Sequence, residues 1–183
     1  MFLMFVKLCR RAVVPLVGRS VGMEVALIGA GMSAMGIADL ALIPVAGVLM
    51  DTRGRKTVGV PAFIVMALGF ALLGVLEKLV EATGIEPAWL VVAGSVTIGV
   101  GSGLASGMNQ VLGMDASPPA GPDAATFLGV WRMMSDSGAL LGPVVAGAVA
   151  QRWGVHVASL CVGVVGVCGG GWLGCFVQAW RKT

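Results

Sequence analysis

The chain has 183 residues, of which 57% are hydrophobic and only 11% are charged, and its net charge at pH 7 is +3. Soluble domains carry roughly 25% charged residues, so the 12 basic and 9 acidic residues are too few to cover the surface of a water-soluble domain of this length. The composition therefore excludes an ordinary soluble protein, and the small net charge does not indicate a nucleic-acid partner. We expect the lipid bilayer to surround most of the chain.

Six apolar segments follow one another, and they predict an all-α integral membrane bundle in a single domain over residues 1–183. A membrane-spanning helix needs about 20 mostly apolar residues. Five segments meet this requirement, whereas the first is short and interrupted by Lys7, Arg10 and Arg11. These basic residues either face an internal cavity or form a flank beside the membrane. In chain order, the segments cover residues 1–18, 21–50, 57–76, 88–114, 126–150 and 155–180.

The connections between segments are short and polar, so sequential helices are expected to be antiparallel. They cover residues 51–56, 77–87, 115–123 and 151–154. Five basic residues near segment ends then lie on one side of the membrane, namely Arg53, Arg55, Lys56, Arg181 and Lys182. Three lie on the other side, namely Arg19, Lys78 and Arg152. Because basic residues favour the cytoplasmic side, the 51–56 loop and the C-terminus are predicted to be cytoplasmic, or on the equivalent side of an organelle.

No pattern in the chain indicates an enzyme, a metal site or a cofactor. Cys161, Cys168 and Cys175 are spaced seven residues apart in one apolar segment, which separates neighbours by about 10 Å along a helix. They are therefore too far apart to share a metal ion. The glycines from Gly99 to Gly103 superficially resemble a nucleotide-binding loop, but they lie inside an apolar helix with no preceding strand. We expect no catalytic residue, no metal and no cofactor.

The loop between the second and third segments is the most specific feature of the sequence. It matches the pattern G-x-x-x-D-x-x-G-R-K and contains Gly47, Asp51, Arg53, Gly54, Arg55 and Lys56. Gly47 and Asp51 are four residues apart, on one face of a helix end. Gly54 permits a tight turn, and the basic residues after it are free to form ion pairs. A generic basic loop that happens to hold Asp and Gly is the alternative interpretation.

This loop resembles the signature found between the second and third helices of each half in the major facilitator superfamily. The segment from Thr126 to Gly147 also resembles the fifth helix of such a half, and Pro15-Leu16 resembles the end of its first helix. The resemblance covers residues 5–180. It implies transport across a membrane by one of the two six-helix halves that members usually contain.

Two features point to different halves of such a transporter. Gly138-x-x-x-Gly142-Pro143 resembles the antiporter signature, which favours the N-terminal half. Pro15-Leu16, Asp39 and Trp131-Arg132 together are more typical of a C-terminal half, which we take as the better match.

Charged and polar residues inside the apolar segments are candidates for a cavity. A charged group at mid-membrane costs at least about 2.5 kcal/mol, so it persists where it is paired or lines a cavity. Asp39 lies deep in the second segment, and Arg132 and Asp136 are spaced to pair on one helix face. The alternative for this pair is a structural role near a helix end. Asn109 and Gln110 complete the set of candidates.

Small residues repeat every four positions in the fourth segment, at Ser95, Gly99, Gly103 and Gly107. Such stripes let helices approach closely, and they either pack the bundle or slide during transport. Gly138, Gly142 and Pro143 are expected to pack the fifth segment in the same way.

These observations predict a half-transporter for a small organic solute or drug, which needs a second six-helix bundle from a copy of this chain or from another polypeptide. The alternative is a non-transporting structural or assembly subunit of a larger membrane complex, derived from such a half. A third possibility is that the chain is a fragment of a longer protein. The expected partners are therefore lipid, a second bundle or a larger complex, and a small-molecule substrate.

Overall fold

The computed structural model describes residues 2–119 and 121–176. These residues form eight α-helices and no strand, in agreement with the predicted all-α fold. The helices are α1 (Phe2–Ser20), α2 (Val25–Arg53), α3 (Arg55–Gly74), α4 (Leu76–Thr83), α5 (Pro87–Leu104), α6 (Met108–Ala116), α7 (Pro122–Trp153) and α8 (Val155–Phe176).

Five helical stretches are long and apolar enough to cross a membrane, which confirms that the chain is a multi-pass integral membrane protein. They are Val25–Arg53, Arg55–Gly74, Pro87–Ala116, Pro122–Trp153 and Val155–Cys175. The stretch Pro87–Ala116 comprises α5 and α6, which count as one crossing. Helix α1 is continuous over 19 residues despite its basic side chains and an internal Pro15. It packs among the five spans but is not one of them.

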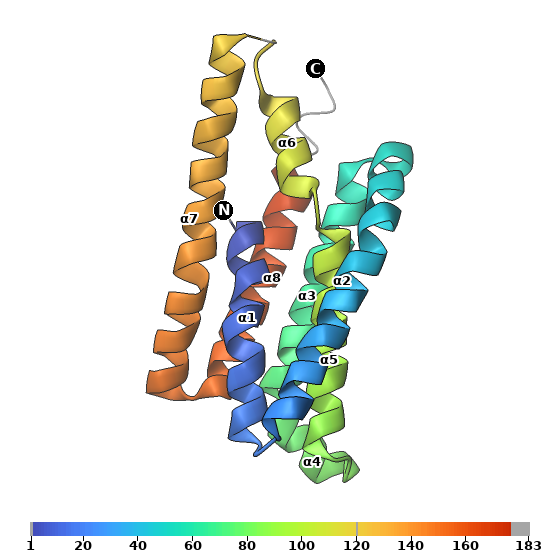
Figure 1. Ribbon diagram of the computed structural model, residues 1–183, viewed down its shortest axis with the longest axis vertical. Helices are drawn as coiled ribbons and strands as arrows, with labels where there is room; N and C mark the ends of the chain where they lie inside the picture. Colours follow the sequence, from blue (N-terminus) through green and yellow to red (C-terminus); the bar gives the residue numbers. More distant parts are fainter. Residues whose placement is uncertain (1, 120, 177–183) are drawn as a thin grey trace.

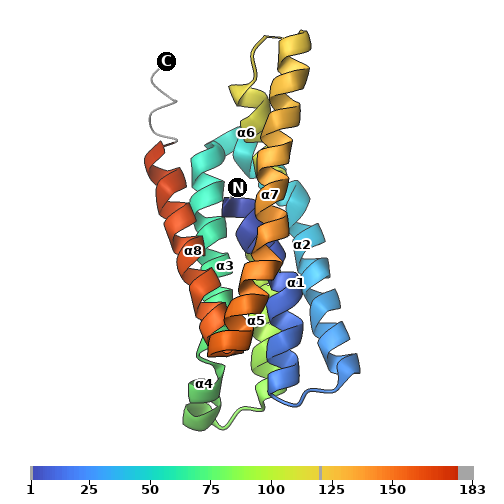
Figure 2. The ribbon, with the colours of Figure 1, turned by 90° about the vertical axis from the view of Figure 1, so that its left-hand side faces the viewer.

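Helix α1 lies inside the bundle, with α7 on one side and the group of α2, α3 and α5 on the other (Figure 1). It packs against α7 and α8, while α3 packs against α8 and α5, and α2 packs against α5. The start of α7, α6 and the α2–α3 turn lie at one end of the bundle, which we call the α6 end. Helix α4 and the α7–α8 turn lie at the opposite end, the α4 end, in both views (Figure 1, Figure 2).

Several boundaries differ from the sequence-based expectation. Helix α7 begins at Pro122, before the predicted start at residue 126, and it continues through most of the predicted connection 151–154, up to Trp153. The predicted loop 51–56 is almost entirely helical, since α2 continues to Arg53 and only Gly54, with φ +87°, separates it from α3. The predicted connection 77–87 contains the short helix α4. The predicted segment 88–114 is broken between Leu104 and Met108, where Gly107 adopts φ +80°. A glycine tolerates this left-handed conformation because it has no Cβ.

Small residues allow α2 and α5 to touch through their backbones. A Cβ added at Gly103 would meet the Asp39 carbonyl oxygen at 2.6 Å, and one added at Gly99 would collide with the Met35 carbonyl oxygen. Gly107 does not continue this stripe, because it lies in the helix break with no atom within 4 Å of an added Cβ. The close contact is thus limited to one stretch of α5, directly beside Asp39.

Helix α7 approaches α1 through its own small residues. A Cβ added at Gly142 would meet the Phe5 carbonyl oxygen at 2.8 Å. Gly138 is also buried, and Pro143 lies partly buried inside α7. Gly142 therefore lies in the contact with α1, and Gly138, four residues before it, lies on the same face of α7.

Candidate functional site

Five polar side chains from α1, α2, α5 and the turn after α5 meet in the interior of the bundle, and we call them the charge cluster: Lys7, Arg10, Asp39, Ser102 and Ser106. Arg10 Nη2 donates to Asp39 Oδ2 at 2.6 Å. The hydroxyls of Ser102 and Ser106 each donate to the Asp39 carboxylate at 3.2 Å. Lys7 Nζ donates to Ser106 Oγ at 2.7 Å and lies 4.0 Å from Asp39 Oδ1. Asp39 is therefore the shared acceptor of the cluster.

Spacing within each segment puts the polar side chains of that segment on one face. Lys7 and Arg10 are three residues apart and therefore lie on one face of α1. Ser102 and Ser106 are four apart, and the Gly103 backbone between them contacts the Asp39 backbone. Asp39 is the central residue of α2, with equal helical lengths on both sides, so the cluster lies near the middle of a membrane crossing.

Arg10 is not fully satisfied by Asp39. The residue is 8% exposed, and its Nε and Nη1 atoms are enclosed without a hydrogen-bond partner among the described residues. The side chains of Lys7 and Asp39 remain 20% and 14% exposed, and the neighbouring Arg11 is exposed. The cluster therefore holds two basic groups around one carboxylate and borders a partly open face of α1.

Among the described residues, one ion pair links the turn between α2 and α3 to another helix. Arg55 pairs with Asp115 near the end of α6, which ties the start of α3 to the end of the α5–α6 span. Asp51 and Arg53 are exposed and form no ion pair with a described residue, while Lys56 is half-buried. A Cβ added at Gly47 would meet nothing within 4 Å, so the Gly47 face of α2 is open in this structure.

A family model, that of the Major Facilitator Superfamily, matches residues 3–181. The chain belongs to the major facilitator superfamily. No curated protein and no solved structure gives a significant match. The superfamily consists of membrane transporters that carry solutes through rocking helical bundles, and its members are generally not enzymes. The Gly54 turn and the charge cluster are thus parts of a transporter-family fold.

The other polar candidates of this superfamily chain lie away from the charge cluster. Arg132 Nε and Asp136 Oδ2 are 3.9 Å apart on α7, and both side chains are mostly exposed. The Asn109 carbonyl oxygen accepts a hydrogen bond from Trp131 Nε1 at 3.0 Å, and Asn109 Oδ1 accepts one from Ser135 at 3.2 Å. Asn109 therefore connects α6 to α7. Gln110 is exposed.

The sequence alone singled out Asp39 but not its partners. It left open whether Lys7 and Arg10 face a cavity, and it gave no role to Ser102 in the cluster. Ser102, near the end of α5, and Ser106, in the turn after it, are four residues apart in an otherwise uncharged apolar segment, and this spacing is the signal that marks this face. The partners of Asp39 are 29, 63 and 67 residues away in sequence, so only the fold brings them together.

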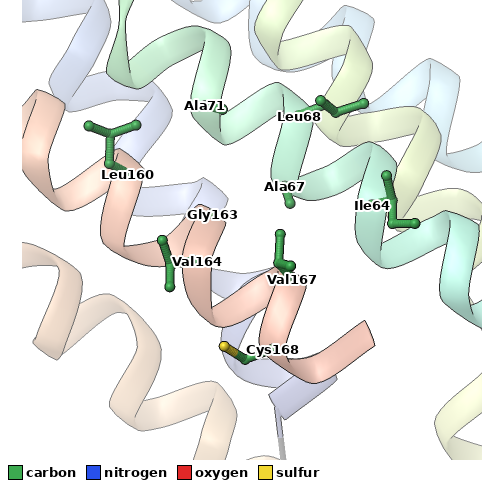
Figure 3. A pocket seen from close by; sticks show the side chains of 9 residues that line it. All are labelled: Ile64, Ala67, Leu68, Ala71, Leu160, Gly163, Val164, Val167 and Cys168. Atoms are coloured by element: carbon green, nitrogen blue, oxygen red, sulfur yellow. The ribbon is translucent and has the colours of Figure 1, made fainter. Parts of the chain in front are cut away.

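A separate apolar groove of about 320 Å³ lies between α3 and α8, away from the charge cluster (Figure 3). Ile64 and Leu68 of α3 and Val164 of α8 line it, and Ala67 of α3 and Val167 of α8 point toward one another (Figure 3). None of the nine lining side chains is charged. A groove of this composition on two membrane-spanning helices fits hydrocarbon rather than a polar solute.

Proposed function

We propose that this chain is one six-helix half of a secondary transporter for a small organic solute, with the charge cluster on its solute-facing side. The observation that carries the proposal is the placement of Lys7, Arg10 and Asp39 near the middle of an apolar bundle in a family of transporters. Ionisable groups at this depth are costly and usually mark a substrate or ion pathway. Transporters place such sites near the bilayer midplane.

A second bundle would cover α2 and α7, the two long helices that flank α1. These two helices are less buried inside the bundle than the other three candidate spans. Large apolar side chains project from them, including Leu40 and Val48 on α2 and Leu140 and Val144 on α7. A second bundle seated on these helices would enclose the open face of α1 and create a central cavity. It would come from a copy of this chain or from another polypeptide.

The α6 end would face the cytoplasm, as the count of basic residues along the sequence predicts. Arg53, Arg55 and Lys56 lie at this end, whereas Arg181 and Lys182, the other two basic residues of that count, lie outside the described residues. Asp51, exposed and without an ion pair to a described residue, is then available to contact the second bundle. Together with the Arg55–Asp115 pair, it would latch this end in one state of the transport cycle.

The proposal is tested by solute counterflow in proteoliposomes, with the full chain and a panel of small anionic, neutral and cationic organic solutes. Asp39→Asn keeps the size of the side chain but removes the central acceptor, and we expect it to lower flux at least tenfold. Asp123→Asn is the matched control, since Asp123 is an exposed carboxylate in the first turn of α7, and its flux is expected to equal that of the unmodified chain.

Native mass determination in detergent identifies the assembly in the same preparation. A homodimer or a complex with one other six-helix chain, together with flux, supports the half-transporter. A larger hetero-complex without flux for any solute class contradicts it and favours the structural-subunit alternative.

A further inference from the structure

The charge cluster has more positive than negative charge. Lys7 and Arg10 surround the single carboxylate of Asp39, and the remaining partners are the neutral hydroxyls of Ser102 and Ser106. Arg11, the next residue on α1, is exposed and adds a further cation beside the cluster. An uncompensated cation inside a membrane bundle is expensive, so this arrangement favours an additional anion.

The free hydrogen-bonding capacity of Arg10 identifies where such an anion would bind. A guanidinium offers five N–H donors, and Asp39 occupies only Nη2, at 2.6 Å. Nε and Nη1, which together carry three N–H groups, are enclosed without a partner among the described residues. A buried donor without an acceptor destabilises a fold, whereas a carboxylate or a phosphate matches the planar guanidinium well.

We propose that the charge cluster binds a small organic anion, through a carboxylate or phosphate group held by Arg10 and Lys7. This inference rests on the proposed transport function and names its substrate class. Asp39 competes with the anion, because it occupies Arg10 and lies 4.0 Å from the Lys7 ammonium group. In this structure α1 and its neighbours enclose the free Arg10 nitrogens, so the anion binds when the bundle opens toward the cavity.

The test measures binding of succinate and inorganic phosphate to the purified full chain in detergent by isothermal titration calorimetry. Tetraethylammonium chloride and glycerol serve as cationic and neutral probes. We expect saturable binding of at least one of the two anions and none of the cation or of glycerol. Succinate alone would assign the site to carboxylates, and phosphate alone would assign it to phosphate-bearing solutes. Absence of binding for both anions overturns the proposal.

Two substitutions have opposite expected effects, which separates a ligand site from a structural ion pair. Arg10→Gln is expected to weaken anion binding roughly tenfold or more, the range for a lost charge-assisted hydrogen bond. Asp39→Asn is expected to strengthen binding, because it removes the competing carboxylate. Arg19→Gln is the control, since Arg19 is an exposed cation in the last turn of the same helix, and its affinity is expected to be unchanged.

Equal affinity in all three variants, or weaker binding in Asp39→Asn, overturns the proposal. Should Arg10→Gln fail to fold because Asp39 loses its partner, the double variant Arg10→Gln/Asp39→Asn removes both charges, and it must then bind anions at least tenfold more weakly than Asp39→Asn. Flux of neutral or cationic solutes without anion binding refutes the anion site and leaves transport standing. Anion binding without flux of any solute refutes transport and leaves the site standing.

Discussion

The contact between α2 and α5 yields the sharpest prediction about stability, through the substitution Gly103→Ala. The added Cβ would lie 2.6 Å from the Asp39 carbonyl oxygen and 3.1 Å from the Asp39 Cα, whereas ordinary contact begins at 3.4 Å. These neighbours are backbone atoms and cannot rotate away. The helices must therefore separate by about 0.8 Å at this point, the difference between 3.4 and 2.6 Å.

Such a separation also disturbs the charge cluster. The hydrogen bonds from Ser102 and Ser106 to Asp39 are already 3.2 Å long, so a shift of this size breaks them. Overpacking costs about 1–3 kcal/mol, and interhelical hydrogen bonds in membranes contribute on average about 0.6 kcal/mol each. Alanine gains no more than about 1 kcal/mol from its higher helix propensity. We expect Gly103→Ala to lower the free energy of unfolding by about 1–3 kcal/mol.

The assay is reversible unfolding in mixed micelles with increasing sodium dodecyl sulfate, followed by circular dichroism. Gly147→Ala is the matched control, since this glycine lies inside α7 with nothing within 4 Å of an added Cβ. It is expected to leave stability unchanged or to raise it by up to about 1 kcal/mol. A Gly103→Ala variant as stable as Gly147→Ala would refute the assignment of a tight α2–α5 contact.

Three further predictions concern ion pairs and the ends of the bundle. Asp51→Asn is expected to lower solute flux without preventing membrane insertion, and normal flux in proteoliposomes would count against a latch at this residue. Asp115→Arg is expected to lower the free energy of unfolding by about 1 kcal/mol, because it breaks the pair with Arg55. The exchange Arg55→Asp/Asp115→Arg should recover most of this loss, and a double variant no more stable than the single variant would contradict the pairing. Glu77 Oε1 lies 3.1 Å from His156 Nε2, but the Glu77 side chain is 73% exposed, so water screens the pair. Glu77→Gln is therefore expected to change the free energy of unfolding by less than about 0.5 kcal/mol, and a loss above about 1 kcal/mol would contradict this screening.

Membrane insertion and family membership follow from local properties of the sequence. Each apolar segment needs about 20 residues without many charges, and this requirement is visible in any window of the chain. The Gly54 turn is equally local, because a glycine between a polar helix end and a basic helix start specifies a bend. The prediction failed where a helix continues through polar residues, as α2 does at Thr52, whose hydroxyl donates to the Val48 carbonyl oxygen at 2.7 Å. It also failed inside the fourth apolar segment, which breaks at Gly107.

The composition of the charge cluster was decided by the tertiary structure. Lys7 alone was compatible with a cavity or a membrane flank, and its contact with Ser106 joins residues 99 positions apart. The break at Gly107 and the exposure of Arg132 likewise depend on how α5, α6 and α7 pack. Periodicity shows which residues are apolar and therefore which segments enter the membrane. It does not show which helix faces which, because in lipid that choice depends on close packing and on pairing of buried polar groups between distant segments.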